Sequence, residues 1–360
     1  MKIIEPTPPV SLLGYIGINK KSKSEKFKDV LLTLRGRDAI SLAFNHFKLE
    51  ENDTVLLPGY LCEVIHSPLT KKYNIEYYDI EKDFSINPDT IESFFSRQKV
   101  KILYIIHYFG FLQKHLKQIS DLCKKYGVFL IEDHAHSALS DFSYDYADAM
   151  IFSFRKIFPI PDGGGLWLKD SIDLKFDKRS ILYSSLISFL IILHRSRIGR
   201  SKMLKAKANK MGQSMTSSTF EGSSKINPKP ISYLSGKIVK NSDIEKLVAI
   251  RRDIYNKWLE LFSESRFKPL YSSLPDDVCP QGFPIRIKNP DDVMANLQEQ
   301  NIILKIHWSL RQEMMQKCPT SFSISKSIIT LPIYPELSEH DMEKILRLVT
   351  QYGIPMDESN

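Results

Sequence analysis

Cysteine is scarce in this chain. Only four are present among 360 residues, Cys62, Cys123, Cys279 and Cys318, and no two of them form a CxxC pair. Cysteines so widely separated argue against a structural zinc site and against a disulfide framework. The sequence therefore indicates a protein of a reducing compartment, and we expect no metal site.

Long apolar runs are also absent. No stretch reaches the roughly 18 to 20 apolar residues that a transmembrane helix needs, and prolines interrupt the first residues, MKIIEPTPPVSLLGYIG, where a signal peptide has its apolar core. We therefore expect a cytoplasmic protein. Its formal net charge of +8 is compatible with nucleic acid, an anionic membrane surface or phosphorylated substrates as partners. No nucleic-acid motif favours the first of these, so we expect no nucleic-acid partner.

What the chain does have is length and a regular alternation of apolar segments. Hydrophobic residues make up 42% of the sequence, enough for one large domain and a smaller one. Strand-like segments lie near residues 55, 75, 102, 128, 149 and 165, and helical patterns fill the longer gaps. The run KILYIIHYFGF is almost continuously apolar, as expected of a parallel strand buried on both faces. This alternation predicts βαβ units and a doubly wound sheet.

The stretch 128–170 gathers side chains that can carry chemistry. Its first strand, Val128 to Ile131, ends on Glu132 and Asp133, and His136 follows three residues later. Ligands of open α/β sheets bind at this carboxyl edge. An aspartate after a strand is usually only a turn or helix-cap residue. The prediction of a site therefore depends on the residues at the end of the next strand.

A lysine follows the next apolar run. The run from Ala149 to Phe154 leads to Lys156, and a lysine at the end of a buried strand is costly unless it is paired or functional. A desolvated lysine has a lowered pKa and can form a Schiff base. The glycines 163–165 permit close backbone approach. A carboxylate, a lysine and a hydroxyl- and glycine-lined phosphate site are what pyridoxal phosphate (PLP) requires.

These motifs resemble those of the DegT/DnrJ/StrS-type family of PLP-dependent aminotransferases, fold type I, which make amino sugars on nucleotide-linked substrates. Family members commonly read E-D-x-A-Q/H, then S-F-x-P-x-K, then G-E/D-G-G. This chain has Glu132-Asp133-x-Ala135-His136, then Phe152-Ser153-Phe154 and Lys156, then Asp162-Gly163-Gly164. Its serine and lysine are three residues apart, whereas five is commoner. The resemblance covers roughly residues 28–170 and implies a large domain with a mostly parallel, doubly wound, seven-stranded-type sheet, followed by a smaller C-terminal α+β domain.

The resemblance assigns roles within this stretch. Lys156 would form the Schiff base with PLP and act as the catalytic base and acid, and Asp133 would pair with the pyridine nitrogen. His136 would lie against the cofactor ring near its phenolic oxygen. Ser153 would bind the phosphate.

Two earlier segments also match. A glycine turn that opens a helix is an anion site, and by the resemblance Gly36, Arg37 and Asp38 would cradle the phosphate; a plain helix start is the alternative. Arg37 replaces the usual small hydroxyl residue, and it either adds a charge to the phosphate or faces solvent. The aromatic residue that stacks on the pyridine ring is replaced by Cys62. Either Tyr60 takes over this stacking, or Tyr60 only packs in the core.

Three residues are candidates for substrate contacts. By the resemblance His107 lies in a loop that lines the site, and His307 and Trp308 occupy the substrate mouth; a satisfied surface histidine and a core tryptophan are the alternatives. Family sites are shared across a two-fold interface, so we expect a homodimer. In the family, one segment of each subunit would reach the phosphate bound to the partner subunit. Its counterpart here is residues 230–235, PISYLS, which lack the family's Asn and Arg.

The resemblance fades over residues 178–230. The segment ILYSSLISFLIILHRSRIGRSKMLKAKANK sets some thirteen mostly apolar residues beside a basic stretch. It suits either a helix packed in a dimer or domain interface, or peripheral contact with the inner face of a membrane through residues 181–210. We expect a lead-in over residues 1–27, a large PLP-binding domain over 28–240 that contains this insert, and a small domain over 241–360.

The sequence predicts a PLP-dependent aminotransferase. By the resemblance it would transfer an amino group, with glutamate as donor, to a keto sugar that is nucleotide-linked, for amino-sugar and surface-polysaccharide (O-antigen) biosynthesis. The alternative is a degenerate PLP-binding relative with a regulatory or scaffold role. It is kept open because Cys62, the short spacing between Ser153 and Lys156, and the missing Asn all depart from the family's site.

Overall fold

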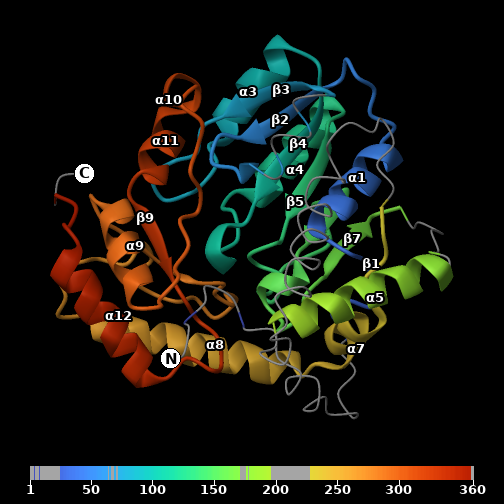
Figure 1. Ribbon diagram of the computed structural model, residues 1–360. Coiled ribbons are helices and arrows are strands. Elements are labelled where there is room, and N and C mark those ends of the chain that lie inside the picture. The colour runs from blue at the N-terminus through green and yellow to red at the C-terminus, as the bar shows by residue number, and fades with distance from the viewer. Residues whose placement is uncertain are drawn as a thin grey trace.

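The chain forms a large and a small domain that lie side by side (Figure 1). The computed structural model describes residues 4, 8, 25–63, 65, 69, 72–170, 176, 178–195 and 228–357. Within these residues a seven-stranded sheet forms the large domain and a two-stranded sheet the small one. This confirms the predicted α/β class with a smaller second domain. The exact domain boundaries remain predictions.

The large sheet is mostly parallel, as predicted. Its strand order is β1-β7-β6-β5-β4-β2-β3. Strands β2 to β6 pair in parallel, whereas β7 is antiparallel to both of its neighbours, β6 and β1. The strands are β1 (Leu31–Thr33), β2 (Thr54–Pro58), β3 (Asn74–Tyr78), β4 (Val100–Ile106), β5 (Phe129–Asp133), β6 (Ala149–Phe152) and β7 (Gly164–Leu168).

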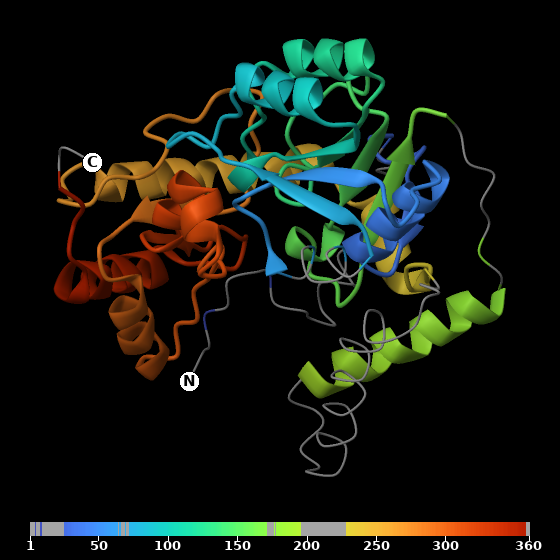
Figure 2. The ribbon, with the colours of Figure 1, turned by 90° about the horizontal axis from the view of Figure 1, so that it is seen from above.

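Helices cover both faces of this sheet. Figure 2 shows α3 (Pro88–Arg97) and α4 (Leu116–Tyr126) on one face and α1 (Gly36–His46) on the other. The inner strand β4 is therefore buried almost throughout, which explains its near-continuous apolar sequence. Local signals fix the helix ends: the Asn87 side chain accepts a hydrogen bond from the Asp89 N–H at 2.9 Å to cap α3, and α4 ends on Gly127, whose φ of 67° suits glycine.

The small domain packs its own core around two antiparallel strands. One long helix, α12, is closed at its start by a capping box between Ser338 and Asp341. The Asp79 carboxylate of the large domain accepts hydrogen bonds from Thr320 and Ser321 at the start of α11, each 2.8 Å long, which ties the domains together. The elements are β8 (Phe283–Arg286), α9 (Pro290–Glu299), α10 (Met314–Lys317), α11 (Pro319–Ser325), β9 (Ile328–Leu331) and α12 (Glu339–Tyr352).

Helix α8 (Ile244–Phe262) runs beneath both domains (Figure 1). Its apolar face buries Trp258, whose indole N–H donates to the Pro332 carbonyl at 3.0 Å. Arg251 is also buried, and its guanidinium donates to the carbonyls of Pro280 and Gln281 at 3.0 and 2.9 Å. Near its start, Leu247 and Val248 pack against a hydrophobic cluster of the large domain, so the helix contacts both domains.

Helix α5 (Lys178–Arg195) lies at the edge of the molecule, away from the large sheet (Figure 2). It exposes three apolar side chains on one face, Leu182 (69% exposed), Leu186 (58%) and Phe189 (50%). None of the described helices combines the length and the apolar character that crossing a membrane requires. The rest of the predicted insert, residues 196–227, lies outside the described residues, as do most of residues 1–24.

Candidate active site

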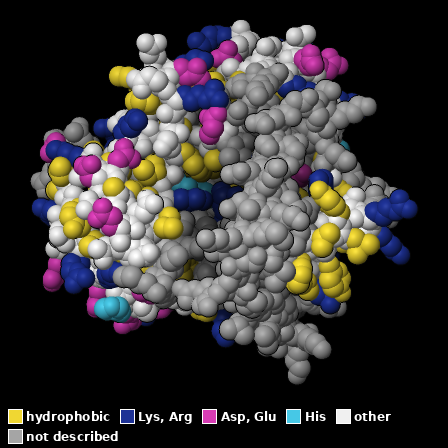
Figure 3. All heavy atoms as spheres, viewed as in Figure 1, with side chains coloured by type: hydrophobic (Ala, Val, Ile, Leu, Met, Phe, Trp, Pro, Cys, Tyr) yellow, Lys and Arg dark blue, Asp and Glu magenta, His cyan; other side chains and the backbone are white. Residues whose placement is uncertain are grey.

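A pocket lies at the carboxyl edge of the large sheet, facing the small domain. We call it the edge pocket. Figure 3 shows Lys and Arg side chains gathered in the hollow between the two domains. The ends of β4, β5 and β6 and the start of α1 supply most of its wall, because parallel strands align their carboxyl ends. Its lining includes Asp133, His136, Ser153, Lys156, Lys305 and Trp308.

A single 3₁₀ turn brings Ser153 and Lys156 together. The segment Phe154–Lys156 forms a short 3₁₀ helix, and the Lys156 N–H donates to the Ser153 carbonyl at 3.2 Å. Side chains three residues apart eclipse in this geometry. The three-residue spacing therefore lets both side chains line the edge pocket.

Lys156 lies in surroundings that favour its neutral amine. Burial is the largest cause, and the positive charge of Lys305 adds to it, so that the pKa of Lys156 falls to about 8. Asp133 opposes this shift without cancelling it. At neutral pH a much larger fraction of this amine is unprotonated than in an ordinary lysine. Such an amine is a competent nucleophile toward an aldehyde.

Asp133 is a buried carboxylate held by neutral donors. Its Oδ1 accepts a hydrogen bond from the Ala135 N–H and its Oδ2 accepts one from the Tyr104 hydroxyl, each 2.7 Å long. Burial raises the pKa of Asp133, although Lys156 and the Tyr104 hydroxyl counteract this rise. Because both donors are neutral, these hydrogen bonds do not offset the negative charge of the carboxylate. A cationic N–H donor beside it would stabilise the ionised form.

His136 offers one donor to the edge pocket. Its Nδ1 accepts the Phe109 N–H at 3.3 Å, which leaves the proton of the neutral ring on Nε2. Burial, followed by the charge of Lys156, lowers the pKa of His136 well below its usual value, so the ring is neutral. Among the described residues Nε2 has no hydrogen-bond partner. A buried donor of this kind fits an oxygen acceptor on a bound molecule.

The glycine turn forms one end of the edge pocket, where an anion would bind. Gly36 begins α1, and both Gly36 and Arg37 line the pocket. Gly164 packs so tightly beneath this turn that a Cβ at its position would collide with the Arg35 backbone, which explains the glycine-rich sequence there. The Asp38 side chain does not line the pocket; its Oδ1 accepts the Lys229 N–H at 3.3 Å, and burial raises its pKa to about 6.

The charge of the edge pocket is strongly positive. Among the residues that the structure describes, five cationic side chains line it but only one carboxylate, that of Asp133. Burial and the repulsion of its cationic neighbours lower the pKa of Arg37 to about 10. Such a pocket binds anions, and more negative charge than a single carboxylate carries. The five are Arg35, Arg37, Arg155, Lys156 and Lys305.

Tyr60 packs in the core, whereas Trp308 lines the edge pocket. Tyr60 is fully buried and is absent from the pocket lining; its ring packs 5.5 Å from Tyr108 and 5.2 Å from Trp308. Trp308 lines the edge pocket, and its ring stacks on His136 at 5.4 Å between centroids and 28° between planes. The core-packing alternative therefore describes Tyr60, and Trp308 is the aromatic residue at the pocket.

His107 and His307 are buried, and neither lines the edge pocket. His107 is fully buried: its Nε2 lies 3.0 Å from Glu132 Oε2, and its Nδ1 accepts the Gln113 N–H at 2.9 Å. His307 is 1% exposed, and its Nδ1 lies 2.7 Å from the Thr330 hydroxyl. Neither ring lines the edge pocket, because these hydrogen bonds hold both in the interior, and a substrate contact stays a prediction for both residues.

Glu132, the hydrogen-bond partner of His107, also contacts a second histidine. His134 Nε2 lies 3.2 Å from the same Glu132 oxygen. Both hydrogen bonds lower the pKa of Glu132 to about 2 against the opposing effect of burial, and burial, with His107 beside it, lowers that of His134 to about 4. These three side chains form a buried hydrogen-bonded cluster. It supports the end of β5 just before Asp133.

Sequence reasoning missed several residues at the site, among them Tyr104, Arg35, Arg155 and Lys305. Tyr104 lies in the apolar run of β4, and a polar hydroxyl within such a run is the sequence feature that could have indicated a role at the site. Lys305 belongs to the small domain, and no local pattern links it to the strand ends. Its position depends on how the two domains meet.

The residues of the edge pocket fit PLP. His136 Nε2 is a buried donor that lacks a partner among the described residues, and Asp133 is a buried carboxylate whose hydrogen bonds come only from neutral groups. Lys156 has the lowered pKa of an imine-forming lysine. Cationic side chains surround the glycine turn where a phosphate would bind. The individual roles of these residues stay predictions.

Comparison with known proteins begins with a family model. The model described as the DegT/DnrJ/EryC1/StrS aminotransferase family matches residues 26–179 and 238–350. These segments include the edge pocket and exclude most of residues 178–230, where the predicted resemblance fades.

Curated relatives are sugar transaminases. A dTDP-3-amino-3,6-dideoxy-alpha-D-galactopyranose transaminase of Aneurinibacillus thermoaerophilus is 23% identical over 340 residues, which span 88% of this chain and 84% of the relative. A UDP-4-amino-4,6-dideoxy-N-acetyl-beta-L-altrosamine transaminase of Campylobacter jejuni is 27% identical over 163 residues, 43% of this chain. That match spans only 41% of the Campylobacter protein.

Solved structures share the fold over nearly the whole chain. The PLP form of the sugar aminotransferase Spr1654 from Streptococcus pneumoniae superposes with a TM-score of 0.68 and 16% identity, covering 97% of this chain and 98% of that one. Helicobacter pylori PseC, an aminotransferase of pseudoaminic acid biosynthesis, gives 0.65 and 15%, covering 97% and 99%. At these identities the likeness establishes the fold, and it confirms the predicted fold type I.

Proposed function

Because this chain belongs to the DegT/DnrJ/EryC1/StrS aminotransferase family, we propose that it is a PLP-dependent aminotransferase acting on nucleotide-linked keto sugars. One observation carries the proposal: Lys156, Asp133 and His136 line one pocket, where burial lowers the pKa values of Lys156 and His136. The names of the relatives support the sugar-nucleotide class.

PLP, when bound, supplies an electrophilic carbon and an aromatic ring that accepts electrons from the substrate carbon. Lys156 would bind it covalently through its unprotonated amine, for which the lowered pKa of about 8 prepares it. When its amine is free, Lys156 would also be placed in this pocket to take up and release a proton during the reaction.

Two other residues hold charges in place. Asp133 would keep the pyridine nitrogen protonated, since its carboxylate accepts only neutral donors among the described residues. His136 would donate from Nε2 to the phenolic oxygen, and its ring orientation is fixed by the Phe109 N–H on Nδ1. Gly36, Arg37 and Ser153 would hold the phosphate end.

The excess positive charge supports an anionic acceptor. A bound phosphate offsets part of the charge of the five cationic side chains, and the remainder suits the diphosphate of a sugar nucleotide or the carboxylates of glutamate, our proposed amino donor. This chain would therefore add the amino group in amino-sugar biosynthesis for a surface polysaccharide. Which sugar and which ring carbon it uses is open to a substrate screen.

Assembly is part of the proposal. We propose a homodimer in the cytoplasm, with the apolar face of α5 packed in an interface between subunits; Leu182, Leu186 and Phe189 support this by their exposure. Alternatively, this apolar face of α5 would contact the inner surface of a membrane, through residues 181–210. Liposome co-sedimentation of the purified protein separates the two, because a face covered by a partner subunit would not bind vesicles.

The alternative is a PLP-binding protein that has lost transamination. It is favoured by Cys62, which stands in the pocket where the family has an aromatic ring. Absorption spectra of the PLP-loaded protein, recorded before and after glutamate is added, distinguish the two. A visible imine band that glutamate removes supports transamination; a band that ignores every amino donor supports the alternative. Protein that shows no band at all refutes both.

A further inference from the structure

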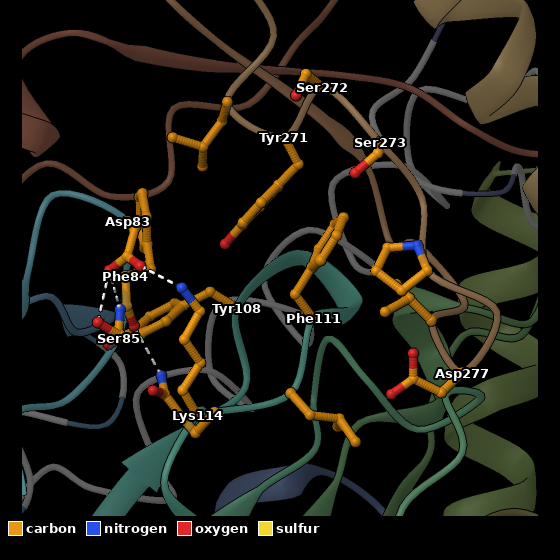
Figure 4. A pocket seen from close by; sticks show the side chains of 15 residues that line it. Asp83, Phe84, Ser85, Tyr108, Phe111, Lys114, Tyr271, Ser272, Ser273 and Asp277 are labelled. Atoms are coloured by element: carbon orange, nitrogen blue, oxygen red, sulfur yellow. Dashed lines mark hydrogen bonds and ion pairs between the residues drawn. The ribbon is translucent and has the colours of Figure 1, made fainter.

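A second pocket lies where loops of the large domain meet residues 270–278 of the small domain (Figure 4). We call it the junction pocket; its volume is about 400 Å³. No residue that lines it also lines the edge pocket. Tyr108 lines the junction pocket, and its ring lies 6.2 Å from that of Trp308, which lines the edge pocket. A wall of aromatic rings therefore separates two neighbouring pockets.

An aromatic surface forms one side of the junction pocket. The rings of Phe111 and Tyr271 stack with centroids 3.6 Å apart and planes 16° apart, and both residues are half-buried. In Figure 4 the Tyr271 ring extends into the middle of the pocket, with Ser272 and Ser273 above it. The negative face of such a ring attracts the weakly positive C–H bonds on one face of a sugar ring. A flat aromatic ring beside hydroxyl groups therefore suits a saccharide.

Gln113 places a fixed acceptor in the wall. It is 8% exposed, and its amide nitrogen donates to the carbonyls of Phe84 and Ile106 at 2.9 and 2.7 Å. Those two bonds fix the orientation of the amide and leave its oxygen as an acceptor. Among the described residues this oxygen has no hydrogen-bond partner. A ligand that carries O–H or N–H donors would satisfy it.

The charged groups around the pocket carry a net negative charge. Lys114 and Asp83 pair at 2.6 Å, so they largely offset one another. Asp277 lies across the pocket from them (Figure 4). Arg252 is no part of the lining; its guanidinium donates to the carbonyls of Pro275 and other residues of the loop that bears Asp277, and so holds that loop in place. The unbalanced carboxylate favours a cationic ligand and disfavours a phosphate.

We propose that the junction pocket binds a saccharide that carries an amino group. The sugar ring packs on Tyr271, its hydroxyl groups donate to Gln113, and its ammonium group pairs with Asp277. The inference is independent of the reaction at Lys156, since the two pockets share no lining residue. An amino sugar is also the product class of the proposed reaction, so the site would let that product bind without entering the edge pocket.

Calorimetric titration of the PLP-loaded protein with glucosamine tests this, with glucose, which carries a hydroxyl in place of the amine, as the matched ligand. We expect glucosamine to bind more tightly than glucose, and Asp277→Asn to weaken glucosamine binding about tenfold, the worth of one charge-assisted hydrogen bond. The matched control is Asp276→Asn: Asp276 is exposed, pairs with Arg252 and lies outside the lining. This variant should bind as the wild type does.

Lys156→Ala separates this proposal from the proposed function. Glucosamine binding should survive Lys156→Ala, whereas transamination should not. Binding that is lost in Lys156→Ala would place the sugar in the edge pocket and overturn the inference. Equal losses in both aspartate variants, or no binding of glucosamine to the wild-type protein, would overturn it as well.

Discussion

The edge pocket and the junction pocket border the same aromatic wall and differ in charge. Five cationic side chains and one carboxylate line the first, whereas two carboxylates and one lysine line the second. Their rings nearest one another, those of Trp308 and Tyr108, are 6.2 Å apart. The fold therefore supplies two hollows where its domains meet, and the charged side chains decide which ligand each one accepts.

The two pockets also differ in how they are built. The edge pocket takes most of its groups from strand ends and from the start of a helix, which the sheet fixes in position. The junction pocket takes its groups from loops, and Arg252 and Arg251 of α8 hold the loop of the small domain through its carbonyl groups. The first arrangement suits covalent chemistry, which tolerates little movement, and the second suits reversible binding.

Lys156→Ala should have the largest effect, because it removes both the nucleophile and the proton carrier. We expect the single-turnover reaction of the PLP-loaded protein with glutamate to slow on the order of 10³-fold or more. Stopped-flow absorbance measures this rate. Lys344→Met, outside the pocket, is the control and should keep the reaction; a variant without Lys156 that reacts at the wild-type rate would refute the assignment.

Asp133→Asn should have the next largest effect. The amide keeps the size of the side chain and can still accept the Ala135 N–H, but its NH2 group cannot accept from Tyr104, and the neutral amide cannot hold a proton on the pyridine nitrogen. We expect the same reaction to slow on the order of 10²-fold to 10³-fold. Tyr104→Phe, which leaves the carboxylate in place, should cost far less. Equal losses in the two variants would mean that Asp133 acts only through packing.

Lys305→Met should shift a pH profile. Burial is the main cause of the lowered pKa of Lys156, and Lys305 is the next, so removing Lys305 should raise that pKa above about 8. The neutral amine captures PLP, and its fraction grows as pH rises through the pKa. The midpoint of the capture rate against pH should therefore move to higher pH, while Lys344→Met on the surface should leave it unchanged. A midpoint that stays or falls would contradict the account.

Asp277→Asn should have the smallest effect on transamination. Since Asp277 lies outside the edge pocket, we expect the rate with glutamate to stay within about twofold of wild type. The same variant should lose glucosamine binding. A variant that loses both would show that the two pockets are coupled and do not bind their ligands independently.

Much of the fold and part of the site are predictable from the sequence. Each predicted strand, near residues 55, 75, 102, 128, 149 and 165, lies within a few residues of an observed strand, because buried parallel strands leave continuous apolar runs. Asp133, His136 and Lys156 lie in one pocket, as expected because the carboxyl ends of parallel strands meet at one edge of the sheet.

Other features depend on contacts that sequence spacing does not encode. The position of His107 at a strand end predicts a substrate contact, but Glu132 and Gln113 hold its ring in the core. Tyr60 is a candidate for ring stacking by its sequence position, and the packing of the small domain puts Trp308 at the pocket instead. The charge of the pocket also depends on Lys305, which only domain packing brings near.

The most direct test of the central claim locates the bond to PLP. The PLP-loaded protein is reduced with borohydride, which fixes a Schiff base as a stable amine, and the modified peptide is identified by mass spectrometry. The pocket holds two lysines, Lys156 and Lys305, so the experiment has a built-in competitor. We predict that the cofactor is attached to Lys156. Attachment to Lys305, or to neither, would contradict the account.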